Sequence, residues 1–144
     1  MLLKTIRELE QWMKENCFNF DSYSINGNFI YEGFGIDNSG GLFIWYYTER
    51  GERDNLKYFV TESEATIYAY NQIKADKWAK AHCIGFTQNK MKSIELGNKL
   101  NEMNIAFFQD EIPYNGKHLF SYRTFVFGCD VRKVIGLKQE YPSE

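Results

Sequence analysis

The side chains of this chain that could do chemistry are few and scattered. The two histidines are His82, which is followed directly by Cys83, and His118, which lies in an expected loop. Neighbouring residues on a strand point to opposite faces, so His82 and Cys83 are not placed to share one metal ion. The same divergence separates the adjacent carboxylates Asp110 and Glu111, so we do not expect an acid–base pair there. We therefore predict no catalytic residues and no metal site.

Two glycine clusters are candidates for phosphate-binding loops. Gly33-Phe34-Gly35 lacks the third glycine of a dinucleotide-binding loop and lies among expected strands, and Gly40-Gly41 is not followed by a lysine. Both clusters are better explained as a bend and a turn. We therefore expect no cofactor and no enzymatic activity. Because active sites can assemble from distant residues, an enzymatic or small-molecule-binding α+β domain with an aromatic pocket is the alternative.

The charges of the chain are distributed unevenly. The whole sequence has 17 basic and 19 acidic residues, a net charge of -2, which indicates no general attraction to nucleic acid or to anionic membranes. Between residues 18 and 65, however, eight acids face only three bases, whereas residues 66–104 contain six lysines and three acids. Any electrostatic recognition by this protein is therefore expected to be local.

The acids of the first half cluster around expected turns. If these turns gather at one end of a sheet, they form an acidic rim, to which residues near the last turn could add. The residues that we predict to bind a partner there are Asp37, Glu49, Glu52, Asp54, Asp110, Glu111 and Tyr114. Such a rim suits a basic protein surface, because charge speeds encounter and aromatic side chains supply affinity. The competing interpretation is an ordinary solvated surface.

The elements that would position these residues follow from periodicity and turn residues. Leu2, Ile6, Leu9 and Met13 recur at helical spacing and predict a first helix. The next segment predicts four antiparallel strands near residues 18–25, 28–36, 42–49 and 55–60, with Asn26-Gly27 as a hairpin turn.

The second half alternates between helices and strands. Thr61 begins a capping-box pattern and predicts a helix to about residue 75. A strand is expected at 78–86, and Thr87 is a candidate cap for a helix that continues to about residue 103. Residues 105–112 and 121–130 are expected as the last two strands.

This order predicts an α+β fold with a mostly antiparallel sheet. An N-terminal helix precedes a four-stranded meander, an α-β-α-β-β segment follows, and the helices pack on one face of the sheet. At 144 residues, and without a linker or an internal repeat, the chain is expected to form one domain over residues 1–144.

The cysteines and the N-terminal segment indicate where the protein works. Cys17, Cys83 and Cys129 are odd in number and widely spaced, so we expect reduced thiols and no disulfide framework. The N-terminus carries charges early, and the longest apolar run, residues 42–47, is too short to cross a bilayer. We therefore predict a cytoplasmic protein.

Four strings of the sequence resemble one of the immunity-protein families of bacterial polymorphic toxin and contact-dependent growth inhibition systems. They are Thr61-Glu-Ser-Glu-Ala65, Ile73-Lys-Ala-Asp-Lys-Trp-Ala-Lys-Ala-His-Cys-Ile-Gly-Phe86, Phe107-Phe-Gln-Asp-Glu-Ile-Pro-Tyr114 and Tyr122-Arg-Thr-Phe-Val-Phe-Gly-Cys-Asp130. The similarity covers mostly residues 58–131.

The resemblance implies a small cytoplasmic α+β protein that acts as an antitoxin. Its partner would be the C-terminal toxin domain delivered by a neighbouring cell, and it would bind no nucleic acid directly and no membrane. Many such toxins are nucleases with basic substrate clefts, which would suit an acidic rim. The resemblance supplies no contact residues, so the rim is inferred from charge alone. The oligomeric state stays open.

Overall fold

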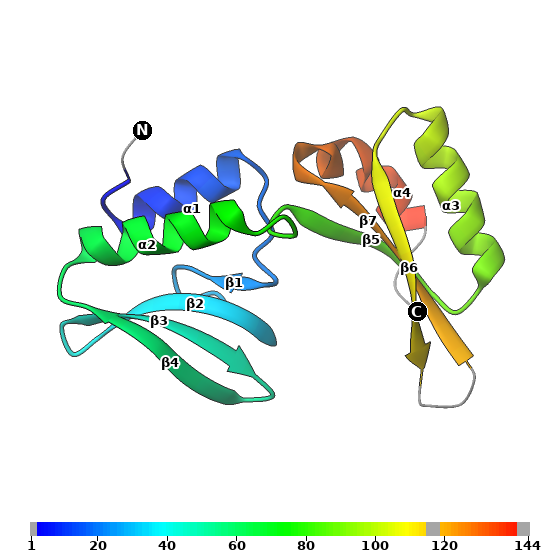
Figure 1. The fold of residues 1–144 in the computed structure, drawn as a ribbon. Coiled ribbons are helices and arrows are strands. Elements are labelled where there is room, and N and C mark those ends of the chain that lie inside the picture. The colour runs from blue at the N-terminus through cyan, green and yellow to red at the C-terminus, as the bar shows by residue number, and fades with distance from the viewer. Residues whose placement is uncertain (1–2, 115–118, 141–144) are drawn as a thin grey trace. The chain divides into compact units, whose positions relative to one another are not determined.

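The computed structural model describes residues 3–114 and 119–140, and the chain divides into two compact units, Met1–Ala79 and Lys80–Glu144 (Figure 1). The first unit contains α1 (Ile6–Glu15), β1 (Tyr23–Ser24), β2 (Glu32–Ser39), β3 (Leu42–Glu49), β4 (Glu52–Phe59) and α2 (Glu62–Ala75). The second unit contains β5 (Ala81–Thr87), α3 (Lys90–Glu102), β6 (Phe107–Tyr114), β7 (Leu119–Phe127), the 3-10 helix η1 (Gly128–Val134) and α4 (Ile135–Glu140). The predicted α+β class is confirmed, but the expected single sheet is two sheets, each within its own unit.

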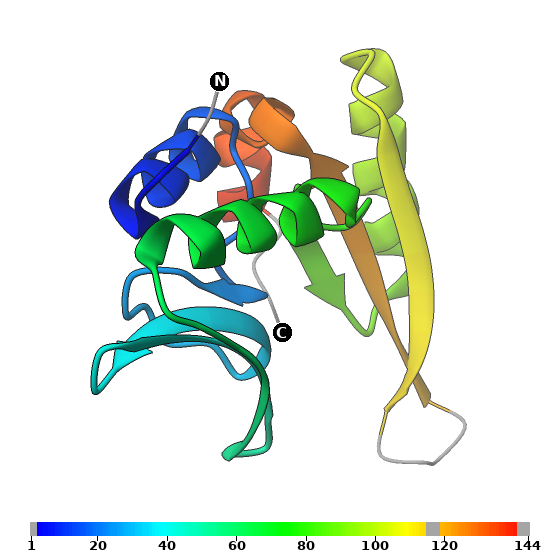
Figure 2. The same ribbon diagram turned by 60° about the vertical axis from the view of Figure 1, so that its left-hand side comes forward.

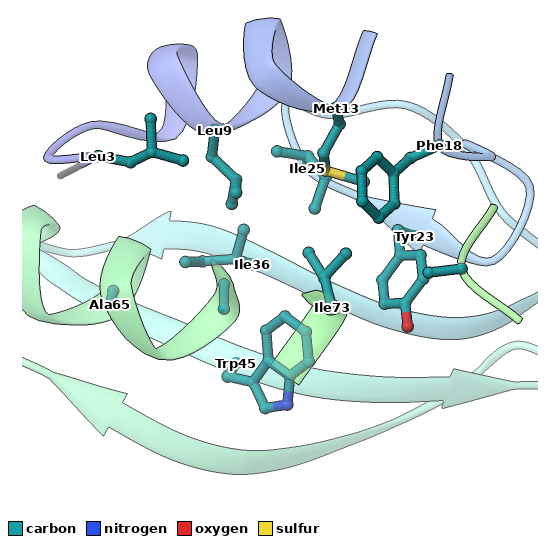
Figure 3. Close-up of a cluster of buried hydrophobic side chains, with 12 residues drawn as sticks. Leu3, Leu9, Met13, Phe18, Tyr23, Ile25, Ile36, Trp45, Ala65 and Ile73 are labelled. Carbon is teal, nitrogen blue, oxygen red and sulfur yellow. The ribbon is translucent and has the colours of Figure 1, made fainter. Parts of the chain in front are cut away.

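The first unit is a four-stranded sheet in the order β1-β2-β3-β4 with α1 and α2 on the same face (Figures 1 and 2). Leu9 and Met13 of α1 meet Ile73 of α2 and the sheet residues Ile36 and Trp45 in one buried cluster (Figure 3). The apolar residues at helical spacing therefore form the buried face of α1, as the sequence predicts. Each helix starts at a threonine, because the hydroxyls of Thr5 and Thr61 accept from backbone N–H groups in the first turn.

The predicted hairpin at Asn26-Gly27 is wrong, because β1 pairs with β2 in parallel. The side chain of Asn28 explains the difference. Its amide nitrogen donates to the Tyr23 carbonyl at 2.8 Å, and its oxygen accepts from the Ile25 backbone at 2.9 Å. These bonds compete with a strand ladder and close a compact loop instead. The first strand is consequently only two residues long, Tyr23–Ser24.

The β3–β4 hairpin is tighter than the sequence pattern suggested. Arg50 and Gly51 both have positive φ angles, +53° and +79°, as a two-residue type I′ turn requires. Strand β4 therefore begins at Glu52 and not near residue 55. Glu49 and Glu52 consequently pair directly across the hairpin.

The second unit is a three-stranded antiparallel sheet in the order β5-β7-β6, on which α3 packs. Gly97 of α3 lies close to the sheet, since a Cβ there would be 3.1 Å from the Gln109 side chain. The cap of α3 is Asn89 and not Thr87, because the Asn89 side chain accepts from the first backbone N–H groups of the helix. Helices η1 and α4 were not expected from the sequence.

The prediction of three reduced cysteines is wrong in part. Cys83 has a free thiol, and burial raises its pKa, whereas Cys17 and Cys129 are not free thiols in the structure. Among the residues that the structure describes, none of the helices has the length and apolar character needed to cross a membrane.

Candidate functional site

Four carboxylates gather at the β3–β4 end of the first sheet. Glu32 of β2 lies opposite Glu49 of β3, and Glu49 lies opposite Glu52 of β4. Asp54 is two residues further along β4, so its side chain points to the same face as that of Glu52. All four residues are exposed. We call the group of Glu32, Glu49, Glu52 and Asp54 the acidic hairpin end.

The acidic hairpin end lies on the helix-covered face of the sheet, beyond the end of α2. Tyr47 lies opposite Asp54, and its ring contacts Phe34 with 5.0 Å between centroids. Phe34 in turn stacks on Trp45, which packs against α2 through Tyr68. In Figure 1 the β3–β4 turn and the C-terminal end of α2 are at the same end of this unit. The turn encloses an open hollow of about 430 Å³ lined by Tyr47, Glu49, Arg50, Glu52, Arg53 and Asp54.

The hydroxyl of Tyr47 forms a hydrogen bond with one carboxylate of the acidic hairpin end. It donates to Glu32 Oε1 at 3.0 Å. That hydrogen bond, together with partial desolvation and the nearby charges of Glu32 and Glu49, raises the pKa of Tyr47 to about 12. The phenol therefore stays a neutral donor at any physiological pH.

We expect Tyr47 to titrate near pH 12, and the variant Glu32→Gln to move this pKa down towards the ordinary value of 10. Because the folded-state pKa is raised, the stabilisation from this hydrogen bond is complete below pH 10 and is lost as the pH rises to about 12. NMR of tyrosine labelled at Cζ measures the titration, and Glu111→Gln in the second unit is the control. An identical Tyr47 pKa in the wild type and in Glu32→Gln would contradict the assignment.

The structure does not bring Asp37 together with the acidic hairpin end. Asp37 lies opposite Ile44, near the β2–β3 turn, on the other face of the sheet. The guanidinium of Arg53 holds its carboxylate with two hydrogen bonds, at 2.6 and 3.0 Å, and also lies 3.7 Å from the ring centroid of Tyr46. The bond to Asp37 raises the pKa of Arg53. Asp37 is thus neutralised by an ion pair and is not a free acidic group.

The other predicted rim residues belong to the second unit. Asp110 forms a two-point ion pair with Arg123 of the neighbouring strand, at 2.9 and 2.6 Å, and Arg123 also lies over Phe125. Glu111 follows on the opposite face and is exposed. Tyr114 ends β6, and its side chain lies outside the described residues. A role of these three residues in binding stays a prediction.

An exposed pair of aromatic rings precedes the acidic hairpin end in the chain. Phe29 and Tyr31 are 75% and 84% exposed, and their rings meet edge to face at 4.9 Å. Ile30 between them is buried, which fixes the direction of both rings. Tyr31 is followed directly by Glu32, so large apolar surface and negative charge adjoin each other. Exposed aromatic side chains next to charges are typical of protein-binding surfaces.

A smaller cavity of about 280 Å³ lies where α2 ends. It is lined by Tyr23, Phe34, Trp45, Gln72, Ala75 and Asp76, and we call it the α2-end pocket. Figure 3 shows Ile73 between the rings of Tyr23 and Trp45. Tyr23 donates to the Asp76 carboxylate, and burial and this hydrogen bond raise the pKa of Tyr23.

The enzymatic alternative would be favoured by a cavity that contains His82 or Cys83. Neither residue lines the three cavities described for the first unit, which measure about 430, 320 and 280 Å³. In the described part of the chain, no group of three or more His, Cys, Asp or Glu residues could hold a metal ion. His118 lies outside the described residues.

Sequence reasoning found three members of the acidic hairpin end but missed Glu32 and the α2-end pocket. A signal for Glu32 existed, because two-residue turns at 40–41 and 50–51 fix the register that lines it up with Glu49 and Glu52. No comparable signal existed for the pocket, since it depends on the parallel pairing of β1. No protein-family model, curated protein or solved structure significantly matches this chain.

Proposed function

We propose that this protein is an immunity protein that binds a cognate bacterial toxin domain and blocks its active or substrate-binding surface. The acidic hairpin end is the observation that carries the proposal. It offers four exposed carboxylates on one face of three neighbouring strands, with the exposed rings of Phe29 and Tyr31 preceding them in the chain. A basic substrate cleft, such as that of a nuclease, is the complementary surface. The likeness of residues 58–131 to an immunity family supports the same proposal.

The way in which the carboxylates are arranged supports a role in binding. Glutamates directly opposite one another in a sheet repel and reduce stability. Glu49 has such a neighbour on each side, Glu32 and Glu52. Arg50 and Arg53 line the same hollow, but Arg53 is engaged by Asp37. A concentration of negative charge that costs stability is readily explained if a positively charged partner covers it.

Mechanistically, the protein would act by occupying the toxin and not by transforming a compound. Opposite charges would speed the encounter, and the aromatic rings would slow dissociation by burying apolar surface. The action would be cytoplasmic, where the toxin works, and would need no cofactor, membrane or direct contact with nucleic acid.

The experiment is co-expression of this chain with the product of the adjacent upstream gene. We expect the chain to rescue cells from that product's toxicity and to co-purify with its C-terminal domain. Rescue together with co-purification would establish the class of function. A toxic neighbour that is neither bound nor neutralised would contradict it.

The alternative function, small-molecule binding or catalysis by an aromatic pocket, has one observation in its favour. The α2-end pocket has aromatic walls and polar groups at its rim. Its volume of about 280 Å³ is at or below the lower end of the roughly 300–1,000 Å³ of pockets for drug-sized ligands. It is therefore better suited to a single side chain than to a metabolite or a cofactor.

A further inference from the structure

We propose that the α2-end pocket is a receptor for one basic side chain, arginine or lysine, of a protein partner. The inference rests on the proposed function for the identity of that partner, but the chemistry of the pocket can be tested without it. The aromatic walls of the pocket, its negative rim and its hydrogen-bond donor together select a cation carried by a peptide.

The walls of the pocket are aromatic. Tyr23 and Trp45 are 3% exposed and form its buried part, and the half-buried Phe34 stacks on Trp45 with 5.5 Å between ring centroids. Aromatic faces attract ammonium and guanidinium groups, and the attraction grows when water is excluded. An arginine side chain can in addition stack its flat guanidinium on such a ring.

The rim of the pocket is negative. Ala75 is the last residue of α2 and Asp76 is its C-cap, so the carbonyl end of a 14-residue helix faces this site. A helix C-terminus carries partial negative charge and favours cations. The Asp76 carboxylate accepts from the Tyr23 hydroxyl and from the Trp78 backbone N–H, which leaves further acceptor positions on its oxygens. Glu32 lies two residues before Phe34 in β2, so its carboxylate is on the same face of the sheet as this wall of the pocket.

The wall of the pocket also presents a hydrogen-bond donor. Trp45 is 3% exposed as a residue, and no described residue accepts from its indole N–H. This nitrogen is not among the fully buried, unpartnered side-chain atoms of the described residues, so it is open to an acceptor from water or from a ligand. A basic side chain has no acceptor of its own, whereas the backbone of the peptide that carries it has carbonyl groups. The pocket therefore fits a peptide segment and not a free metal ion.

The protein's own cations near this end of α2 do not line the pocket. Lys74 lies over the ring of Tyr70 with its Nζ 5.5 Å from the centroid, and Lys77 lies over Trp78 at 5.4 Å. The rim residue Gln72 is exposed and neutral. A partner's cation can therefore enter without displacing an internal ion pair of the described residues that line the pocket.

The test uses the purified full chain and a small probe, N-acetyl-arginine methylamide, which has one guanidinium and two carbonyl groups. The readout is the NMR signal of the Trp45 indole N–H, assigned from its loss in Trp45→Phe. We expect a saturable shift with a dissociation constant of about 1–10 mM, as for one charged group with aromatic contacts. The neutral isostere N-acetyl-citrulline methylamide should bind roughly tenfold more weakly.

Two substitutions of the exposed rim residue make the matched comparison. Gln72→Glu adds a negative charge and should tighten binding of the arginine probe, and Gln72→Lys should weaken it, each by about threefold to tenfold. Both variants should keep the wild-type amide spectrum, because the side chain is exposed. Equal affinities for the arginine and citrulline probes, or equal affinities of the two variants, would overturn the proposal.

The outcomes separate the pocket from the proposed function. Because no toxin is present in this experiment, a failure of the arginine probe overturns the pocket and leaves toxin neutralisation to the co-expression test. Charge-dependent probe binding in a chain that gives no protection in cells would instead support the pocket and contradict the immunity function.

Discussion

The double variant Glu49→Lys/Asp54→Lys is expected to lose about 100-fold in affinity for the proposed toxin partner and to lose protection in cells. The substitutions change the charge of the acidic hairpin end by four units, and each unit at a partly screened interface contributes about 0.7 kcal/mol. Calorimetric titration of the purified proteins measures the affinity, and growth of cells that co-express the toxin measures the protection.

The same variant is expected to keep or slightly raise its stability, which separates binding from folding. Lysine at position 49 would lie between Glu32 and Glu52, so two repulsive cross-strand pairs become attractive. Such pairs contribute about 0.2–1 kcal/mol each. The control is Glu95→Lys on α3, where a change of two charge units outside the acidic hairpin end should leave affinity within about twofold. Undiminished protection by the double variant would remove the acidic hairpin end from the interface.

The variant Gly33→Ala is expected to cost about 3–5 kcal/mol in the free energy of unfolding. Gly33 has a φ of +144°, and a Cβ there would lie 2.0 Å from the backbone oxygen of Ser22. That oxygen accepts from the Phe34 N–H at 3.0 Å and holds β1 beside β2. A side chain at position 33 must therefore push away the strand that carries Tyr23, a wall of the α2-end pocket.

Urea unfolding measures this cost, and Gly41→Ala is the matched control. Gly41 also has a positive φ, +89°, but a Cβ there would meet nothing within 4 Å. We expect the control to lose only about 1 kcal/mol, the conformational penalty without the clash. Equal losses for the two variants would show that close packing of Ser22 against Gly33 does not stabilise the first unit.

The elements of this fold that are encoded locally could be predicted from the sequence. The spacing of Leu9 and Met13 gave α1 its buried face, and the Thr61 cap marked the start of α2. The position of strand β3, residues 42–49, and the approximate positions of β6 and β7 followed from their apolar residues. In each case, neighbours within a few residues decide the structure.

What could not be predicted depends on contacts between distant residues. Asn26-Gly27 favours a hairpin, but the side chain of Asn28 bonds the backbone around Tyr23 and makes β1 parallel to β2. The division into two sheets also left no linker in the sequence, and the change in charge near residue 65 does not coincide with the boundary at Ala79. The residues of a turn do not by themselves decide between a hairpin and a parallel pairing, or between one sheet and two, because contacts with distant residues contribute to each.

The candidate site was predictable only in part, for the same reason. Glu49, Glu52 and Asp54 are near one another in the chain, so charge counting found them. Charge counting also groups Asp37 with them, because its ion pair with Arg53, 16 residues away, is not visible in the sequence. Charge patterns therefore indicate which segments are acidic, whereas only the strand register shows which carboxylates face the same way.

Amide hydrogen exchange of the whole chain, with and without the proposed toxin partner, tests directly whether the acidic hairpin end is the binding surface. If a basic partner covers the acidic hairpin end, exchange should slow at residues 29–34 and 47–54 and at the end of α2. Protection confined to the second unit, or to the outer surface of α1, would contradict the account even if the two proteins bind tightly.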